Sequence, residues 1–274
     1  MPELPEVETI RQGIAPLVTG QPIESVTVRC AKLRWPLPEQ ALSRALPGQH
    51  VASVERRGKY LLLSIGEGTL IVHLGMSGVL RFLPMDLPYG KHDHFNIGFH
   101  QGGQLRLTDP RRFGSVLWTT DDPNSHRLIQ PLGPEPLADS FIADSLLKSC
   151  RGRRVAIKNR IMNAHVVVGV GNIYAAESLF LAGIHPETPA GHVDGAGCER
   201  LVAAIKQVLT AAIQQGGTTL RDFRRGDGQP GYFQQSLQIY GREGQPCLRC
   251  GSLVEQVRQG GRASAFCPHC QPLI

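Results

Sequence analysis

Short hydrophobic runs separated by glycine and proline fill the first half of the chain. Runs of this length and spacing predict the strands of a β-sandwich or barrel. The predicted strands are residues 23–28, 51–54, 60–65, 69–74, 95–99, 105–107 and 116–118.

Apolar positions follow a helical period at the start of the chain and again near its end. Val7, Ile10, Ile14 and Leu17 form one face of a helix that begins near Pro5. A second apolar stripe, which Gly216 and Gly217 should end, consists of Leu201, Ile205, Val208, Leu209, Ala212 and Ile213. Between these regions, residues 130–137 contain three prolines and predict a stiff interdomain hinge. The pattern therefore predicts an α+β protein.

Charge narrows the partner to a polyanion such as nucleic acid. The chain has 29 Lys and Arg against 23 Asp and Glu, a net charge of +6 and a pI near 9.1. It contains no apolar stretch of about 20 residues. The N-terminus also lacks a basic and then apolar signal peptide, so we expect a cytoplasmic protein.

The N-terminus offers a candidate nucleophile. Removal of Met1 would expose Pro2 as a secondary amine, which could attack an electrophilic sugar carbon and hold it as a covalent iminium. The carboxylates of Glu3 and Glu6 follow at once. The alternative is an acidic helix cap after a fortuitous proline.

Four of the seven cysteines have the spacing of a zinc site. Cys247 and Cys250 form one pair, Cys267 and Cys270 form another, and sixteen residues separate the pairs. Four thiolates close a tetrahedral shell and leave no position for water, so we expect one structural Zn²⁺. The remaining cysteines, expected to pack as small hydrophobic residues, are Cys30, Cys150 and Cys198.

A glycine-rich segment ending at Asn172 precedes a predicted helix. Asn172 can cap this helix, and the free amides of its first turn suit a phosphate. Arg151, Arg153, Arg154 and Lys158 add positive charge upstream, which suits a duplex backbone. The same charges could equally form a solvated face.

Two loops in the β-rich half are candidates for reading DNA. One places Met76 between glycines, and the other places Arg111 beside Phe113. A protein that extrudes a base must fill the gap with apolar wedges, while an arginine reads the orphaned partner base. The alternative is that Met76 and Phe113 belong to the core.

Together these residues closely resemble formamidopyrimidine-DNA glycosylase, the bacterial MutM family. The resemblance spans almost the whole chain, and several motifs occur in family order. They cover residues 2–8, 57–61, 73–78, 91–94, 109–114, 169–174 and 227–232, together with the cysteine quartet. Leu4 and Phe113 favour this branch over the related endonuclease VIII branch.

The resemblance implies an N-terminal β-sandwich catalytic domain with flanking helices over residues 1–132. It implies a helical DNA-binding domain of the helix-two-turn-helix type over 133–236 and a zinc-finger β-hairpin over 237–274. It also implies a monomer that works in bacterial base-excision repair. Its activity would be that of a glycosylase and abasic-site lyase acting on oxidised purines opposite cytosine in duplex DNA.

The resemblance also implies a role for each matching residue. Pro2 would be the Schiff-base nucleophile, Glu3 the proton donor and Glu6 its support. Lys59 and Arg262 would be the general acids of β- and δ-elimination.

For DNA, Arg111 would read the estranged cytosine, with Met76 and Phe113 as wedges. His92, Arg153 and Asn172 would hold the backbone. Residues 218–232 resemble the loop that closes on the damaged base in the family.

The segment 162–165 departs from the family pattern, because Asn163 stands where relatives commonly carry aspartate. Loss of that carboxylate would alter a local cap or salt bridge. Two alternatives remain: a glycosylase for oxidised pyrimidines, and a protein that binds lesions without cutting. The second would follow if Met1 were retained or if the change at residues 163–165 disabled the pocket.

Overall fold

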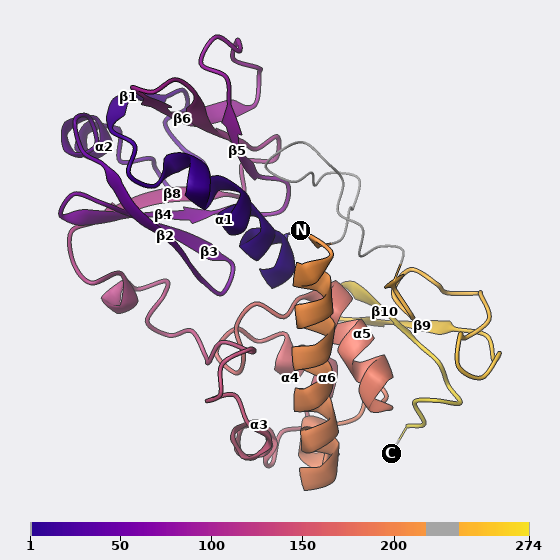
Figure 1. Cartoon of the computed structure of the whole chain (residues 1–274). Helices are drawn as coiled ribbons and strands as arrows, with labels where there is room; N and C mark the ends of the chain where they lie inside the picture. Colours follow the sequence, from indigo (N-terminus) through magenta and orange to yellow (C-terminus); the bar gives the residue numbers. More distant parts are fainter. Residues whose placement is uncertain (1, 218–235, 274) are drawn as a thin grey trace. The chain divides into compact units, whose positions relative to one another are not determined.

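The computed structural model of the chain describes residues 2–217 and 236–273 (Figure 1). Contacts divide these residues into two compact units. One unit contains residues 2–130 with 215–217, and the other contains 131–214 with 236–273.

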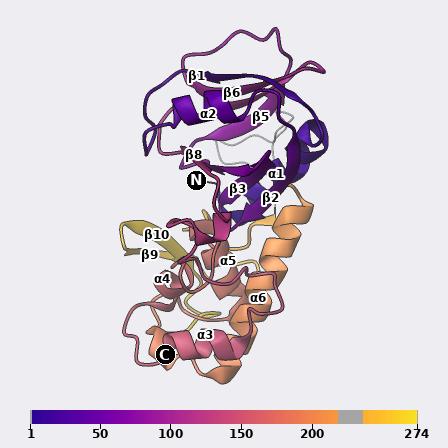
Figure 2. The same ribbon diagram turned by 90° about the vertical axis from the view of Figure 1, so that its left-hand side faces the viewer.

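Two four-stranded antiparallel sheets form the first unit (Figure 2). One sheet has the order β2-β3-β4-β8, with β2 at Val51–Arg57, β3 at Tyr60–Ile65, β4 at Gly68–His73 and β8 at Ser115–Thr119. The other has the order β1-β6-β7-β5, with β1 at Ile23–Val28, β6 at Asp93–Phe99, β7 at Gln104–Thr108 and β5 at Val79–Leu83. A single hydrophobic core joins residues of both sheets, which confirms the predicted sandwich.

Helix α1, Leu4–Val18, contributes to the same core through Val7, Ile10 and Ile14. The prediction that Leu17 is buried is wrong, because its side chain is 43% exposed while Val18 is fully buried. Successive residues are offset by about 100° around a helix, which places position 18 on the face shared by 7 and 14. Leu17 falls at the edge of that face.

Among the described residues, four α-helices and β-strands were not predicted from the sequence. They are β5, α2 at Glu39–Ala45, α3 at Ala143–Cys150 and α4 at Ile157–Ile161. Each is short, and α2 buries only Leu42. In β5 only Leu80 is fully buried. A strand with one buried residue does not show the alternation of apolar and polar positions by which half-buried strands are predicted.

Helices dominate the second unit. Helix α6, Gly195–Gln214, packs against α3 and against α5, Asn172–Ala182. The predicted stripe on α6 is largely buried, with Ile213 half-buried. Gly216 and Gly217 follow the helix with φ angles of 75° and 77°, which confirms their predicted role as its end.

The second unit also contains the hairpin of β9, Glu255–Gln259, and β10, Arg262–Phe266. Gly260 and Gly261 form its two-residue turn with φ angles of 53° and 75°, values that glycine adopts without strain. Short 3-10 turns occupy Pro123–Ser125 and Ala190–His192. The first belongs to the sandwich unit and the second to the helical unit.

The three cysteines outside the quartet pack as buried or half-buried residues, as predicted. Cys150 and Cys198 are fully buried and Cys30 is half-buried. Burial raises the pKa of the Cys198 thiol to about 11, so this thiol stays protonated near neutral pH. No helix within residues 2–217 and 236–273 is long and apolar enough to cross a membrane.

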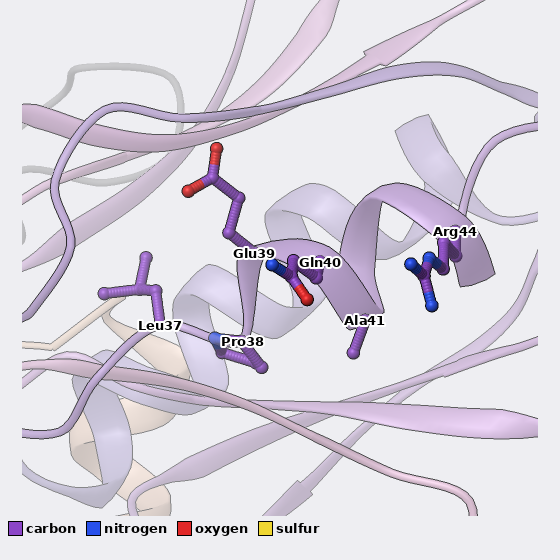
Figure 3. Close-up of a pocket in the computed structure, with 6 residues that line it drawn as sticks. All are labelled: Leu37, Pro38, Glu39, Gln40, Ala41 and Arg44. Carbon is purple, nitrogen blue, oxygen red and sulfur yellow. The ribbon is translucent and has the colours of Figure 1, made fainter.

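An open hollow of ≈ 600 Å³ lies along α2 (Figure 3). Its lining residues are Leu37, Pro38, Glu39, Gln40, Ala41 and Arg44. None of the predicted site residues lines it, and Glu39 and Arg44 lie toward opposite ends of α2.

Candidate functional site

Two buried carboxylates surround the start of α1, directly after Pro2. Glu3 is the N-cap, and its backbone N–H donates to Glu6 Oε2 at 2.9 Å. Both glutamates are 2% exposed, and Pro2 is buried as well. A Cβ at Gly217, whose φ is 77°, would lie 2.9 Å from Glu6 Oε1, so another residue there would strain the backbone and displace the carboxylate. The acidic-cap interpretation is therefore correct for Glu3 and Glu6, and it is compatible with Pro2 chemistry beside them.

Lys59 lies in the two-residue turn between β2 and β3. Gly58, with a φ of 58°, makes this turn possible. Beside it, the rings of Tyr60 and His73 pack with centroids 4.7 Å apart. Burial, together with the charges of Lys59 and Arg34, lowers the pKa of His73 to about 4. His73 is thus neutral near pH 7, and its Nδ1 accepts the Gly75 N–H at 3.0 Å.

The two candidate reading loops both present apolar side chains to solvent. Met76 is 37% exposed and Phe113 is 46% exposed, so neither belongs to the core. The guanidinium of Arg111 lies over the Phe113 ring, 5.1 Å from its centroid. This cation–π contact holds the arginine beside the aromatic ring in the free protein.

His92 is attached to the Arg111 loop through the backbone. Its carbonyl accepts the Asp109 N–H at 2.9 Å, and its ring lies 6.5 Å from that of His94. His94 Nε2 is hydrogen-bonded to the Asp109 carbonyl at 3.0 Å, and burial lowers the pKa of His94. His92 itself is half-buried.

In the second unit, the prediction that Asn172 caps α5 is wrong. Gly171 is the N-cap and Asn172 is the first helical residue. Its side-chain Oδ1 instead accepts a hydrogen bond from Lys158 Nζ at 2.7 Å. The buried ammonium also donates to the Ala263 carbonyl at 3.0 Å and to Ser264 Oγ at 2.6 Å, so it ties α4 to α5 and β10.

The predicted basic cluster is divided by burial. Arg151, Arg153 and Arg154 are exposed, whereas Lys158 is 1% exposed. The prediction that Lys158 is available to a duplex backbone is wrong, because its ammonium is buried and hydrogen-bonded within the unit.

Asn163 retains a local hydrogen bond at the position that departs from the family pattern. Its Oδ1 accepts the backbone N–H of His165 at 2.9 Å. The neighbouring Ala164 carbonyl accepts the Gly133 N–H at 2.8 Å, and a Cβ at Gly133 would lie 2.8 Å from the His165 carbonyl oxygen. An amide oxygen can replace a carboxylate oxygen as acceptor, so the turn is preserved.

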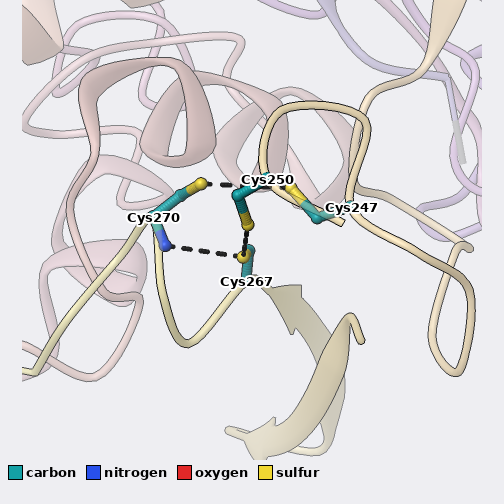
Figure 4. A group of neighbouring side chains, drawn as sticks. All are labelled: Cys247, Cys250, Cys267 and Cys270. Carbon is teal, nitrogen blue, oxygen red and sulfur yellow. Dashed lines mark hydrogen bonds between the residues drawn. The ribbon is translucent and has the colours of Figure 1, made fainter. Parts of the chain in front are cut away.

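Arg262 is exposed on the first residue of β10, next to the Gly260–Gly261 turn. The same segment of chain holds the four cysteines, whose sulfurs all lie within 4.8 Å of one another (Figure 4). Cys247 Sγ lies 4.0 Å from Cys270 Sγ, and Cys250 Sγ lies 3.5 Å from Cys267 Sγ.

The cysteine cluster fits zinc. Four thiolates at about 2.3 Å from a tetrahedral ion lie roughly 3.8 Å from one another, close to both sulfur distances. Arg249, between the first two cysteines, donates to the Phe180 carbonyl at 3.1 Å and lies 4.4 Å from the centroid of its ring. This contact attaches the finger to the end of α5.

Sequence reasoning missed the buried polar residues that hold these loops. Ser77 and Asp109 are 8% and 0% exposed and are hydrogen-bonded to one another. Glu177, on α5, accepts backbone N–H groups from residues 238, 239 and 240. Ser77 and Asp109 lie close in sequence to the predicted loop residues Met76 and Arg111. That position was the signal by which the sequence could have identified them. Glu177 occurs in a continuous apolar run, where a lone carboxylate signals a buried hydrogen-bonding role.

The comparisons with known proteins agree along the chain. Residues 1–116 match the formamidopyrimidine-DNA glycosylase N-terminal domain, and residues 132–224 match the H2TH domain of the same enzymes. Residues 244–273 match the zinc finger found in FPG and IleRS, which together with the sulfur geometry identifies one structural Zn²⁺ site.

Individual relatives match over nearly their full length. Formamidopyrimidine-DNA glycosylase of Pseudomonas putida (strain GB-1) is 57% identical over 271 residues, covering 99% of this chain and 100% of the relative. Its counterpart in Pseudomonas aeruginosa (strain LESB58) is 56% identical with the same coverage.

Solved structures agree as well. The MutM (FPG) protein of Thermus thermophilus has a TM-score of 0.89 at 36% identity, with all of both chains covered. Wild-type Lactococcus lactis Fpg (MutM), in complex with DNA containing N7-benzyl-Fapy-dG, has a TM-score of 0.92 at 35% identity. That match covers 99% of this chain and 100% of the other. With α+β fold, zinc finger and sequence in agreement, the chain belongs to the formamidopyrimidine-DNA glycosylase family, whose members are DNA-repair glycosylases and abasic-site lyases.

Proposed function

We propose that this protein excises oxidised purines, such as 8-oxoguanine and formamidopyrimidines, from duplex DNA and then cleaves the strand. The observation that carries the proposal is the N-terminal arrangement: Pro2 directly precedes two buried carboxylates at the start of α1. The solved relative bound to N7-benzyl-Fapy-dG DNA supports this lesion class. The domains of the present protein would be residues 1–132, 133–236 and 237–274. The protein would act as a monomer on the bacterial nucleoid.

In the proposed reaction, the free amine of Pro2 attacks C1′ of the flipped nucleotide. The bond from C1′ to the base breaks, and the base leaves with its electron pair and takes up the proton that the attacking amine gives up. Glu3 then protonates the sugar oxygen as the ring opens, which leaves an iminium between Pro2 and C1′. Glu6 holds Glu3 by accepting its backbone N–H at 2.9 Å.

Strand cleavage follows from the iminium. It acidifies the C2′ proton, so loss of that proton expels the 3′ phosphate in β-elimination. A second elimination expels the 5′ phosphate, and hydrolysis of the iminium returns the amine. Lys59 and Arg262 each supply a cation that stabilises a departing phosphate. The zinc finger serves to place Arg262 and takes no part in the chemistry.

The remaining site residues would bind DNA. Met76 and Phe113 are exposed apolar side chains suited to enter the stack, and Arg111 is held beside Phe113 to read the cytosine opposite the lesion. His92, Arg153 and Asn172 would contact phosphates. Asn172 keeps its amide N–H₂ for this role, since its oxygen is occupied by Lys158.

Two other functions remain candidates. One is excision of oxidised pyrimidines. The exposed Arg111–Phe113 pair argues against this function, because Phe113 resembles the MutM branch and not the endonuclease VIII branch. The other is lesion binding without cutting, which would require either that Pro2 remain an amide or that the change at residues 163–165 disable the pocket. Met1 and residues 218–232, including the segment proposed to close on the base, lie outside the described residues.

The test is borohydride trapping on a duplex with 8-oxoguanine opposite cytosine, combined with the intact mass of the protein. We expect a stable adduct on a chain that lacks Met1. Pro2→Gly should cripple excision while duplex affinity stays within about twofold, because the phosphate contacts lie elsewhere.

A duplex carrying thymine glycol is the matched substrate for the pyrimidine alternative. Preferential cutting of that duplex would contradict the purine assignment. Lesion binding without any adduct would favour the non-cutting protein.

A further inference from the structure

Asp109 lies at the junction of the two loops that carry the proposed wedge residues. Its carboxylate is fully buried, yet it accepts hydrogen bonds from three neutral donors. These are the Ser77 hydroxyl at 2.9 Å, the Arg111 N–H at 3.3 Å and the Gly114 N–H at 2.8 Å. Two of the donors belong to the loop of Asp109 itself, and the third comes from the Met76 loop.

The Ser77 hydroxyl links both loops through a single atom. Ser77 Oγ donates to Asp109 Oδ1 and lies 3.3 Å from the Arg111 nitrogen, whose N–H it accepts. Met76 directly precedes Ser77 and Arg111 lies two residues after Asp109, and both are exposed residues proposed to contact DNA. A bond to a buried carboxylate is stronger than one between neutral groups, so this link holds two loops that are distant in sequence.

The backbones of the two loops also touch. A Cβ at Gly75 would lie 2.3 Å from the Phe113 carbonyl carbon, so the loops pass one another without room for a side chain. Gly75 has a φ of 64° and Arg112 a φ of 55°. A left-handed arginine is strained, and such a conformation persists where surrounding contacts fix it.

We propose that Ser77 and Asp109 are positioning residues that couple Met76 to Arg111 and Phe113, so that these side chains enter the helix as one unit. This inference rests on the proposed function, in which the exposed side chains contact DNA. Loops that are already joined lose less conformational entropy on binding than loops that must be ordered separately. Removal of the joint should therefore weaken the dependence of one wedge on the other.

A double-mutant cycle measures that dependence. Single-turnover excision of 8-oxoguanine opposite cytosine is compared for the parent, Met76→Ala, Phe113→Ala and the double variant, first with Ser77 present and then with Ser77→Ala. We expect the two wedge substitutions to be non-additive by about tenfold in the parent and by about twofold or less without the hydroxyl. In the same assay, Ser77→Ala itself should raise the enzyme concentration needed for half of the maximal rate more than it lowers the maximal rate.

Ser178→Ala is the matched control. Its hydroxyl is also buried, but it has no hydrogen-bond partner among the described residues and lies on α5 in the other unit. The same cycle in this background should retain the tenfold coupling. Asp109→Asn is a second variant, because an amide cannot accept from all three donors; it should also reduce the coupling, with folding checked by thermal unfolding.

Unchanged coupling in the Ser77→Ala and Asp109→Asn backgrounds would overturn the inference. The cycle is repeated with duplex affinity as the readout, which needs no excision. Failure of the parent to excise the lesion would therefore count against the proposed function alone, while loss of coupling in affinity would still support the joint.

Discussion

At the scale of single residues, burial decides whether a basic side chain is available to a ligand. Arg153 and Lys158 are five positions apart in one basic stretch, and the sequence gives them the same apparent role. The structure leaves Arg153 exposed and encloses Lys158. A buried ammonium requires hydrogen-bond partners, and Lys158 finds them on segments 14 and 106 residues away, which no local pattern reveals.

Lys158→Met should destabilise the helical unit. The substitution leaves the Asn172, Ala263 and Ser264 oxygens without their shared donor, at a cost of about 2–4 kcal/mol in the free energy of unfolding. Urea unfolding measures the loss. Lys148→Met is the control, because Lys148 is 68% exposed and its surface pair with Asp144 is worth under about 0.5 kcal/mol. Equal destabilisation by the two substitutions would contradict the structural role.

His73 should make the sandwich less stable in mild acid. Its pKa is about 4 in the folded protein and 6.5 in an unfolded chain, so the unfolded state binds the proton first as pH falls. The stability that neutral His73 contributes is full above pH 6.5 and is lost progressively as the pH falls from 6.5 to 4. The total is up to about 3 kcal/mol.

The matched variant for this prediction is His73→Asn, which keeps an acceptor for the Gly75 N–H but cannot titrate. The free energy of unfolding is measured at pH 7.5 and at pH 5. The wild-type protein should lose more stability between these pH values than the variant. The prediction is wrong if both proteins lose the same amount.

At the scale of elements, a segment could be predicted where it buries a regular apolar face. The strand at Tyr60–Ile65 was predicted at its observed bounds because its hydrophobic run lies between Gly58 and Gly66. The strand at Ile23–Val28 was predicted because its apolar residues begin directly after Pro22. Helix α2 has one buried residue and β5 has one, so tertiary contacts rather than pattern determine them. Asn172 is polar enough to cap a helix, but α5 has its N-cap one residue earlier, at Gly171, and the Asn172 side chain accepts from Lys158 instead.

Cys247→Ser should release zinc and disorder the finger that carries Arg262. Four thiolates bind the ion together, and loss of one ligand opens the shell, so metal binding and folding of this element are lost together. We expect the protein to lose its zinc by elemental analysis and its duplex affinity to fall roughly tenfold.

Cys30→Ser controls for loss of a thiol, since Cys30 is half-buried and outside the quartet. This variant should keep both zinc and affinity. Retention of zinc by Cys247→Ser would show that the quartet does not bind the ion as a unit.

At the scale of the whole molecule, the class of partner could be predicted from the sequence. Which charged side chains contact that partner and which form internal hydrogen bonds could not. A net charge of +6 indicates a polyanion, and the relatives' DNA complexes agree with that expectation. Motif order predicted the family because the motifs span both units. Which loops are joined to one another depends on hydrogen bonds such as Ser77–Asp109, across 32 positions, and spacing alone cannot supply that information.

Arg153→Ala should separate local phosphate contacts from the effect of net charge. Each neutralised phosphate releases counterions, so the slope of log affinity against log salt should become shallower by about 0.9 when one contact is lost. Arg44→Ala removes the same unit of charge from an exposed site on α2 that has no proposed contact with DNA. If net charge alone governed binding, both substitutions would change the slope equally. We expect the slope to change for Arg153→Ala only, with affinity for undamaged and damaged duplexes weakened by the same factor, because a phosphate contact carries no information about the base.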